Sequence, residues 1–324
     1  MIRTCPRFRE GRRRWRQAGG LTTSGSNRWR SIRDDRMKAD IHGFFDRATN
    51  TASYLLTDPA TDRCAIVDPV WDYDPKSGCT SVTSVAQIER LVEQRGLKVD
   101  LILETHAHAD HLSASQRLKQ TFGAPVAIAS RIVEVQKTFG TIFNLGDAFP
   151  TDGSQFDRLV DDGETLRVGA LEITAIHTPG HTPACMTYVC GDAAFVGDTL
   201  FMPDYGTARV DFPGGDAATL YRSIRRILEL PEDTVLYLCH DYLPPTGRRR
   251  HAWKTTVADQ RRNNIHVHDG VAEGEFVAMR EARDKTLDMP TLILPAVQVN
   301  IRAGHLPPPE ANGVVYLKIP VDTL

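Results

Sequence analysis

The segment 104–114, ETHAHADHLSA, constrains this chain more than any other. It follows the apolar run 99–103, VDLIL, which predicts a buried strand, and it places three histidines and an aspartate within six positions. Polar groups that follow the strands of an open α/β sheet gather in a crevice at the strand ends. Imidazole and carboxylate together favour zinc, iron or manganese over calcium. The sequence therefore predicts a transition-metal centre directly after this strand.

The spacing divides the motif between two neighbouring metal positions. On a loop that leaves a strand, His106 and His108 place their imidazoles on the same side and reach one cation. Asp110 and His111 lie at the start of a predicted helix and point toward a second position beside the first. Four such groups together favour metal binding over a purely structural role.

Three further candidate ligands follow later apolar runs: His181 in TPGHT, Asp198 in VGDT and His240 in LCHDY. A carboxylate such as Asp198 bridges two cations or closes one site. With all groups present, one site would comprise His106, His108, His181 and Asp198, and the other Asp110, His111, His240 and Asp198.

The remaining pattern alternates strands with helices, which indicates α/β layers. Strands are expected at 53–56, 64–70, 99–103, 124–129, within 171–201 and at 234–239, and helices at 84–95, 216–230 and 271–286. A helix that ends at Gly123 is expected after the metal motif, with Asp110 or Ser113 as its cap. The tail after 245 contains the apolar runs 292–295 and 314–319 and is expected to be partly strand-like.

Composition excludes several classes of protein. A net charge of −2 and 41% hydrophobic residues are ordinary for a globular protein, with no basic excess for nucleic acid and no apolar run long enough for a membrane span. Six cysteines without a CxxC pair indicate reduced thiols and a cytoplasmic protein, and Cys239 is expected to be a plain buried residue.

Residues 1–36 differ from the rest, with eleven arginines against three acidic residues. We expect an Arg-rich disordered or mis-annotated extension there, with an organellar targeting segment in a eukaryote or an anion-binding arm as alternatives. The catalytic domain is then expected over 37–324, with a core over about 40–245 and a C-terminal extension over 246–324.

The order of these motifs resembles the metallo-β-lactamase superfamily. His-x-His-x-Asp-His, Gly-His-Thr, Gly-Asp and a late histidine all occur in sequence over roughly residues 40–245. The resemblance implies an α/β fold, a four-layer αββα sandwich with the metal site at one edge between the sheets. Because the superfamily includes hydrolases and oxidoreductases, the fold alone does not decide the reaction.

Five segments look more narrowly like the bacterial persulfide dioxygenase branch: CAIVDPVWDYDPKSG, ETHAHADHLSAS, FVGDTLF, YGTARVDFPGGDA and CHDY. That resemblance implies one Fe(II) per chain, held by His106, His181 and Asp198. It also implies oxidation of a thiol persulfide by O₂ to sulfite and thiol. The groups that would then orient the ligands or relay protons are His108, Asp110, His111 and His240.

Two residues are candidates for contacting the substrate. Arg209, in TARVDF, matches an arginine that the family keeps near iron and substrate, although a salt bridge with Asp211 is an equal alternative. Tyr242 is a candidate hydrogen-bond donor to substrate, or a packing residue. Glutathione-using members carry Asn-Pro-Arg after the last ligand, whereas RRNNIHV at 261–267 has no such arginine. Two alternatives follow for the thiol carrier. Either Arg261 or Arg262 binds glutathione in place of the missing arginine, or the carrier is another low-molecular-weight thiol.

Two other classes of function remain open. A binuclear zinc hydrolase of the glyoxalase II or thioesterase type would use all seven ligands around two zinc ions. Its glutathione thioester is gripped in part by a helical C-terminal domain, which the expected strand-like tail does not match. The third class is a non-enzymatic metal or sulfide sensor. The expected partners are a small thiol persulfide and O₂, with no nucleic acid or membrane, and a homodimer is allowed.

Overall fold

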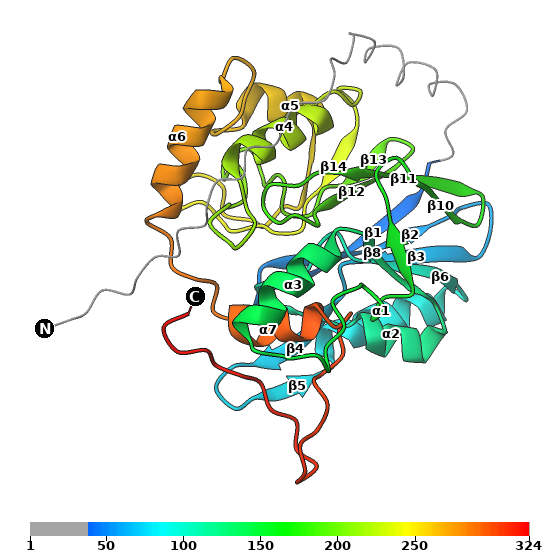
Figure 1. Cartoon of the computed structure of the whole chain (residues 1–324). Helices are drawn as coiled ribbons and strands as arrows, with labels where there is room; N and C mark the ends of the chain where they lie inside the picture. Colours follow the sequence, from blue (N-terminus) through cyan, green and yellow to red (C-terminus); the bar gives the residue numbers. More distant parts are fainter. Residues whose placement is uncertain (1–37, 324) are drawn as a thin grey trace, which may run out of the picture.

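The computed structural model describes residues 38–323, so the expectations for the Arg-rich segment 1–36 lie outside the described residues. Two six-stranded sheets face each other, and helices cover the outer face of each, as Figure 1 shows. The predicted four-layer αββα sandwich is confirmed. Over the described residues, no helix is both long and apolar enough to cross a membrane.

The first sheet carries the strand that leads into the metal motif. Its strands, in spatial order, are β1 (Asp40–Asp46), β2 (Thr51–Thr57), β3 (Arg63–Val67), β6 (Lys98–Leu103), β8 (Val126–Ala129) and β9 (Arg158–Val160). The helices beside it are α1 (Thr83–Gln94), α2 (Ser115–Phe122) and α3 (Ile132–Ile142). β6 is parallel to both of its neighbours, β3 and β8, and the last three of its residues are buried. This explains its unbroken apolar run, since a parallel strand covered on both faces has no solvent side.

The second sheet supplies the later strand-end loops. Its strands, in spatial order, are β10 (Thr165–Val168), β11 (Leu171–His177), β12 (Met186–Cys190), β13 (Ala193–Phe195), β14 (Val235–Tyr237) and β15 (Lys254–Thr256). The helices on its outer face are α4 (Ala217–Ile227), α5 (Val257–Asn263) and α6 (Glu273–Asp284). Asp216 caps α4 by accepting from the Thr219 amide, and the apolar face of α4 packs on Ala194 and Leu236. The expected strands and helices of this half are confirmed.

The two sheets are joined at the edge where the metal motif lies. The Ala52 amide at the start of β2 donates to the Cys239 carbonyl at 2.7 Å, and Thr51 forms a β-bridge with His240. Tyr54 reaches from β2 across the core, where its ring lies 5.3 Å from that of Phe195 in β13. This seam brings the loop after β14 against the first sheet.

A small third sheet frames the metal loop from outside. It contains β5 (Cys79–Ser81), β4 (Val70–Asp74) and β7 (Leu112–Ser113). The expected cap differs in detail, because Leu112 and Ser113 pair with β4 and Ala114, without a side-chain bond, precedes the first residue of α2, Ser115. Ser113 Oγ nevertheless accepts from the Ser115 amide at 3.1 Å, whereas Asp110 forms no hydrogen bond with the described residues of α2. Gly123 ends α2 as expected, with φ of +71° and its amide bonded to Lys119.

The tail after 245 differs from the expectation of a partly strand-like extension. Besides β15 it contains the helices α5 and α6 and a third helix, α7 (Ile293–Asn300), while 314–319 forms no strand. The helix α7 was not expected from the sequence because it contains Pro295. Proline is tolerated in the first turn of a helix, where its missing N–H has no intrahelical partner to lose.

Helix α7 is bound directly to the metal motif. The Asn300 side chain donates to the carbonyls of His108 and His111 at 2.8 and 2.7 Å, and it accepts from the Ser113 amide at 2.8 Å. Asn300 is buried, so these bonds are shielded from water. The C-terminal extension therefore supports the backbone of the loop that presents the histidines.

We expect Asn300→Ala to lower the free energy of unfolding by about 2–4 kcal/mol, because two buried carbonyls and one amide lose their partner. Urea denaturation followed by circular dichroism measures this change. Asn312→Ala is the matched control, since Asn312 is exposed and its side chain donates to the exposed Tyr316 hydroxyl and accepts from the exposed Val314 amide. Equal stability of the two variants would contradict this role of Asn300.

Candidate metal centre

Two histidines and an aspartate from three strand ends converge on one point. His106 follows β6, His181 lies in the loop between β11 and β12, and Asp198 follows β13. His106 Nε2 and His181 Nε2 lie 3.8 and 3.6 Å from Asp198 Oδ2, and all three side chains are buried. Their candidate ligand atoms lie within 4.8 Å of one another. The structure thus brings together the three residues that the resemblance implied as iron ligands.

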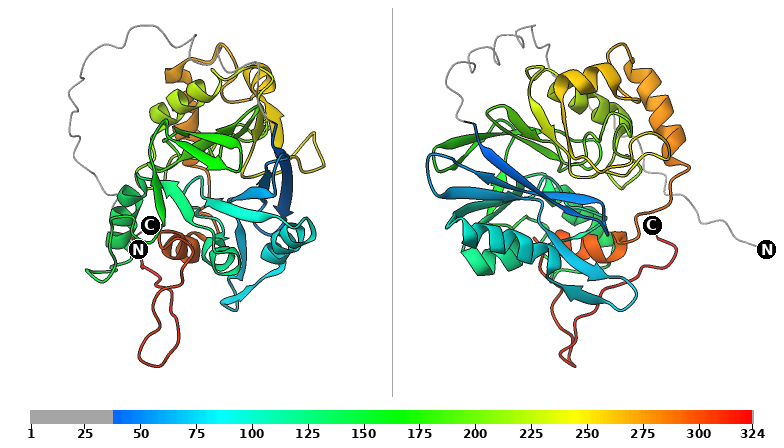
Figure 2. Two further views of the ribbon diagram at one scale, coloured as in Figure 1. Left: turned by 90° about the vertical axis from the view of Figure 1, so that its right-hand side faces the viewer. Right: turned by 180° about the vertical axis from the view of Figure 1, so that it is seen from behind.

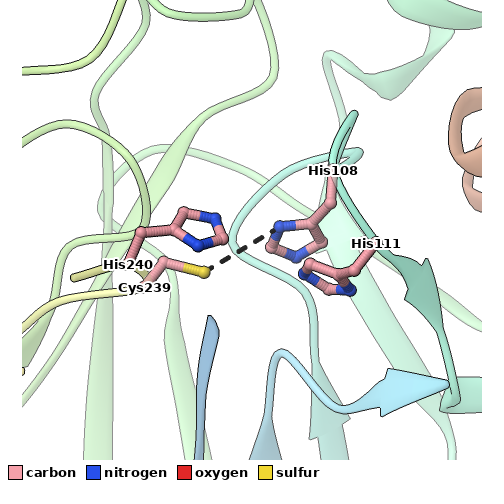
Figure 3. A group of neighbouring side chains, drawn as sticks. All are labelled: His108, His111, Cys239 and His240. Atoms are coloured by element: carbon pink, nitrogen blue, oxygen red, sulfur yellow. Dashed lines mark hydrogen bonds between the residues drawn. The ribbon is translucent and has the colours of Figure 1, made fainter. Parts of the chain in front are cut away.

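A second group lies beside the first, on the far side of Asp198. His108, His111 and His240 gather there with Cys239, whose role the sequence did not indicate. Figure 3 shows the Cys239 thiol directed at the His108 ring, with 3.9 Å between Sγ and Nδ1. His240 Nε2 lies 3.1 Å from Asp110 Oδ2 and 3.3 Å from Asp198 Oδ1.

The site contains buried polar atoms that lack a hydrogen-bond partner. Those atoms are His106 Nε2, Asp110 Oδ2, His111 Nε2, Asp198 Oδ1 and His240 Nε2. His240 Nε2 lies within ion-pair distance of Asp110 Oδ2 and Asp198 Oδ1 but forms no hydrogen bond with either, and His111 Nε2 has no such contact among the described residues. A buried polar atom without a hydrogen bond costs about 1–3 kcal/mol, so five of them in one place favour a shared cation as their partner. Imidazole nitrogen and carboxylate oxygen are the donors that iron and zinc take, so the residues fit either metal.

The other ring nitrogen of each candidate ligand is held by the protein. The Thr105 hydroxyl donates to Asp68 and therefore accepts from His106 Nδ1–H at 3.0 Å, which leaves the lone pair on Nε2. His181 Nδ1 donates to the Arg209 carbonyl at 2.8 Å, and His240 Nδ1 to that of Asn50 at 3.2 Å. Such bonds fix the tautomer and the ring orientation for metal binding.

Asp68 and Glu104 support the loop from behind, and neither was predicted. The Asp68 carboxylate accepts from the Thr105 amide at 2.7 Å and from His108 Nε2 at 3.1 Å. The Glu104 carboxylate accepts from His108 Nε2 at 3.2 Å and from the hydroxyls of Ser113 and Ser115. The available signal was their position, since each is an acidic residue that directly follows an apolar strand.

Two glycines allow the backbones of these loops to approach other parts of the fold. Gly180, before His181, has φ of +135°, and a Cβ there would lie 2.4 Å from the Leu220 backbone in α4. Gly197, before Asp198, has φ of +52°, and a Cβ would lie 2.7 Å from Thr105 Oγ1. Other residues are excluded at both positions by space and by backbone strain.

Burial and neighbouring charges set the protonation of the site. Burial lowers the pKa of His106 well below its ordinary value and that of His111 to about 4, so both are neutral near pH 7. Burial also lowers the pKa of His108, but the charges of Asp68 and Cys239 and the hydrogen bonds to them together outweigh it and hold that pKa well above the ordinary value. Burial raises the pKa of Asp198.

A cavity of about 490 Å³ opens onto the first group of ligands. His181, Asp198 and Asp110 line it on the metal side. Its other walls are aromatic, apolar and cationic, and include Phe201, Tyr205, Phe212, Tyr242, Met289, Arg209, Arg280 and Arg283. This size is within the range of about 300–1,000 Å³ for small-molecule sites.

The two candidate substrate residues both line this cavity. Arg209 donates from Nε and Nη2 to Asp211 at 2.6 and 2.7 Å, and from Nη1 to the Asp288 carbonyl at 2.6 Å. The salt bridge that the sequence offered as the alternative is therefore present. Two of the five guanidinium N–H groups of Arg209 have no hydrogen-bond partner among the residues that the structure describes. The Tyr242 ring stacks on His240 at 5.4 Å, and burial raises the pKa of its hydroxyl well above the ordinary value.

The segment 261–267 does not reach the cavity. Arg261 donates to Asp269 at 2.8 Å, and neither Arg261 nor Arg262 is among the cavity residues. His266 Nδ1 accepts from the Thr207 amide at 3.1 Å, which gives it a structural role.

Residues 46–240 match the family model of the metallo-beta-lactamase superfamily. The chain is 59% identical over 294 residues to a probable metallo-hydrolase of Burkholderia pseudomallei, covering 88% of this chain and 99% of that protein. It is 53% identical to a beta-lactamase hydrolase-like protein of Xylella fastidiosa, covering 88% of this chain but only 65% of that longer protein. The chain belongs to the metallo-beta-lactamase superfamily and is an enzyme of that class.

More distant similarity connects the chain with ETHE1 proteins. It is 28% identical to the human mitochondrial persulfide dioxygenase ETHE1 over 82% of this chain and 88% of that one. The crystal structure of ETHE1 from Myxococcus xanthus superposes with a TM-score of 0.65 at 30% identity, covering 82% of this chain and all of that one.

We expect Asp68→Asn to weaken metal binding about 10- to 100-fold, because the charged acceptor that orients His108 and Thr105 is lost. Competition with a chromophoric chelator measures the affinity. Asp58→Asn is the control, since Asp58 is a buried carboxylate that accepts from the Ala60 and Ala170 amides at a turn apart from the metal groups. An equal loss of affinity in both variants would show that general destabilisation, and not orientation, is the cause.

Proposed function

We propose that this chain is a non-haem Fe(II) persulfide dioxygenase that oxidises a low-molecular-weight thiol persulfide. The observation that carries the proposal is the separate convergence of His106, His181 and Asp198, two imidazoles and one carboxylate. Such a set occupies one face of an iron ion and leaves positions open for substrate and O₂. His108, the additional ligand that a zinc hydrolase would place in this group, instead gathers with Cys239 and His111.

The overall reaction is RSSH + O₂ + H₂O giving RSH and sulfite, and iron, when bound, supplies the redox and O₂ chemistry. The protein holds the persulfide between the aromatic walls of the cavity with its terminal sulfur toward His181 and Asp198. Arg209 and Tyr242 line the same cavity, and their N–H and O–H groups are donors for the sulfur and for the oxygen atoms that it acquires. The aromatic residues exclude bulk water from the reacting atoms.

A binuclear zinc hydrolase of the glyoxalase II type is the second candidate. The contact of His240 Nε2 with Asp110 and Asp198, at 3.1 and 3.3 Å, favours it, because these residues with His111 fit a second cation that Asp198 bridges. The tail after 245 contains the helices α5, α6 and α7, so the expectation of a strand-like tail no longer argues against an enzyme of the glyoxalase II type. In that enzyme these residues would hold the zinc ions, which would supply Lewis-acid chemistry for hydrolysis of a thioester.

We expect His181→Ala to abolish iron retention and persulfide-dependent O₂ consumption together, because one of three ligands is lost. Metal analysis of anaerobically purified protein and an oxygen electrode measure both. His177→Ala is the control, since His177 belongs to the same segment but donates to the Pro183 carbonyl outside the metal groups. Retention of iron and turnover in His181→Ala would refute the proposed ligand set.

We expect His111→Ala to keep about one iron per chain and most of the persulfide-dependent O₂ consumption, because His111 belongs only to the second group. A binuclear hydrolase would lose one zinc ion and its thioesterase activity in the same variant. Metal content, O₂ uptake with glutathione persulfide and hydrolysis of S-lactoylglutathione, measured on one preparation, separate these outcomes.

A further inference from the structure

In the part of the chain that the structure describes, one of the three arginines that line the cavity beside the metal groups has no carboxylate partner. Arg209, Arg280 and Arg283 all line it. Arg280 is buried and donates to Asp284 at 2.6 and 2.9 Å, and Arg209 is paired with Asp211. Among the described residues, no acidic side chain lies within 4.0 Å of the Arg283 guanidinium.

Arg283 is positioned to meet a ligand from solvent. It belongs to the last turn of α6, is exposed, and its guanidinium carbon lies 6.0 Å from the centre of the Tyr205 ring, which also lines the cavity. A guanidinium beside an aromatic face is held in place while its N–H groups stay available. Asp288, another acidic residue of the cavity, forms no ion pair with it.

The other acidic side chains that line this cavity, Asp110 and Asp198, are candidate metal ligands beside His240. A persulfide bound there with its terminal sulfur toward the candidate metal ligands directs the remainder of its thiol carrier toward the arginines that line the cavity. A planar guanidinium recognises a carboxylate through two parallel hydrogen bonds. A thiol carrier without a carboxylate forms no such ion pair with Arg283.

We infer that Arg283 is the carboxylate-binding residue of this cavity, so that the enzyme selects thiol carriers with a carboxylate over neutral ones. This inference rests on the proposed function and extends it to the carrier. In glutathione-using relatives, binding of the carrier involves an arginine after the last ligand. In this chain Arg283 of α6 takes that role, because Arg261 of the segment 261–267 is paired with Asp269 outside the cavity.

Steady-state kinetics on Arg283→Met test the inference. KM for glutathione persulfide rises about five- to tenfold with kcat little changed, as expected for a charge-assisted bond at a partly exposed site. The KM for the neutral 2-hydroxyethyl persulfide stays within about twofold of the wild type, and Arg283→Lys restores part of the loss. Lys285→Met is the control, since it removes the same charge just beyond α6 but outside the cavity.

Calorimetric titration with S-methylglutathione, which has no reactive sulfur, separates this inference from the proposed function. Weaker binding of S-methylglutathione to Arg283→Met, with no O₂ uptake on any persulfide, would uphold the carboxylate site and refute the dioxygenase. An unchanged KM and unchanged S-methylglutathione binding in Arg283→Met would overturn the inference. Failure of the wild-type protein to bind S-methylglutathione would overturn it as well.

Discussion

The metal centre depends on the buried carboxylate of Asp68, which fixes the direction in which the chain leaves β6. A buried charge is tolerated only when hydrogen bonds satisfy it, and Asp68 accepts from the Thr105 amide, the Thr105 hydroxyl and His108. Because the Thr105 hydroxyl is thereby committed as a donor, His106 must present Nε2 to the metal. One carboxylate thus sets the orientation of two histidines, and Asn300 fixes their backbone from the C-terminal side.

The choice between the two proposed reactions depends on how the candidate ligands divide into two groups. Asp198 is placed between them, with Oδ2 toward His106 and His181 and Oδ1 toward His240. The same scaffold therefore serves one iron ion with open positions, or two zinc ions with a bridging carboxylate. The position of His108 with Cys239 favours the first arrangement. Reaction type in this superfamily then follows from a few side-chain contacts on one fold.

The candidate ligands were predictable from sequence because each follows an apolar strand, and strand ends converge in an α/β fold. The supporting residues were not, because a single acidic residue such as Glu104 has no periodic signal and its partners depend on tertiary contacts. Asn300 is the extreme case, since its partners at His108 and His111 lie almost two hundred positions earlier. Arg283 belongs to the same class, because only the packing of α6 shows that it lacks a counter-charge.

The most direct test of the dioxygenase proposal is the metal content of protein purified without oxygen, paired with O₂ uptake on addition of glutathione persulfide. The proposal predicts about one iron per chain and one sulfite formed for each O₂ consumed, as the balanced reaction requires. Two zinc ions per chain, with no O₂ uptake and with hydrolysis of a glutathione thioester, would contradict it and establish the hydrolase.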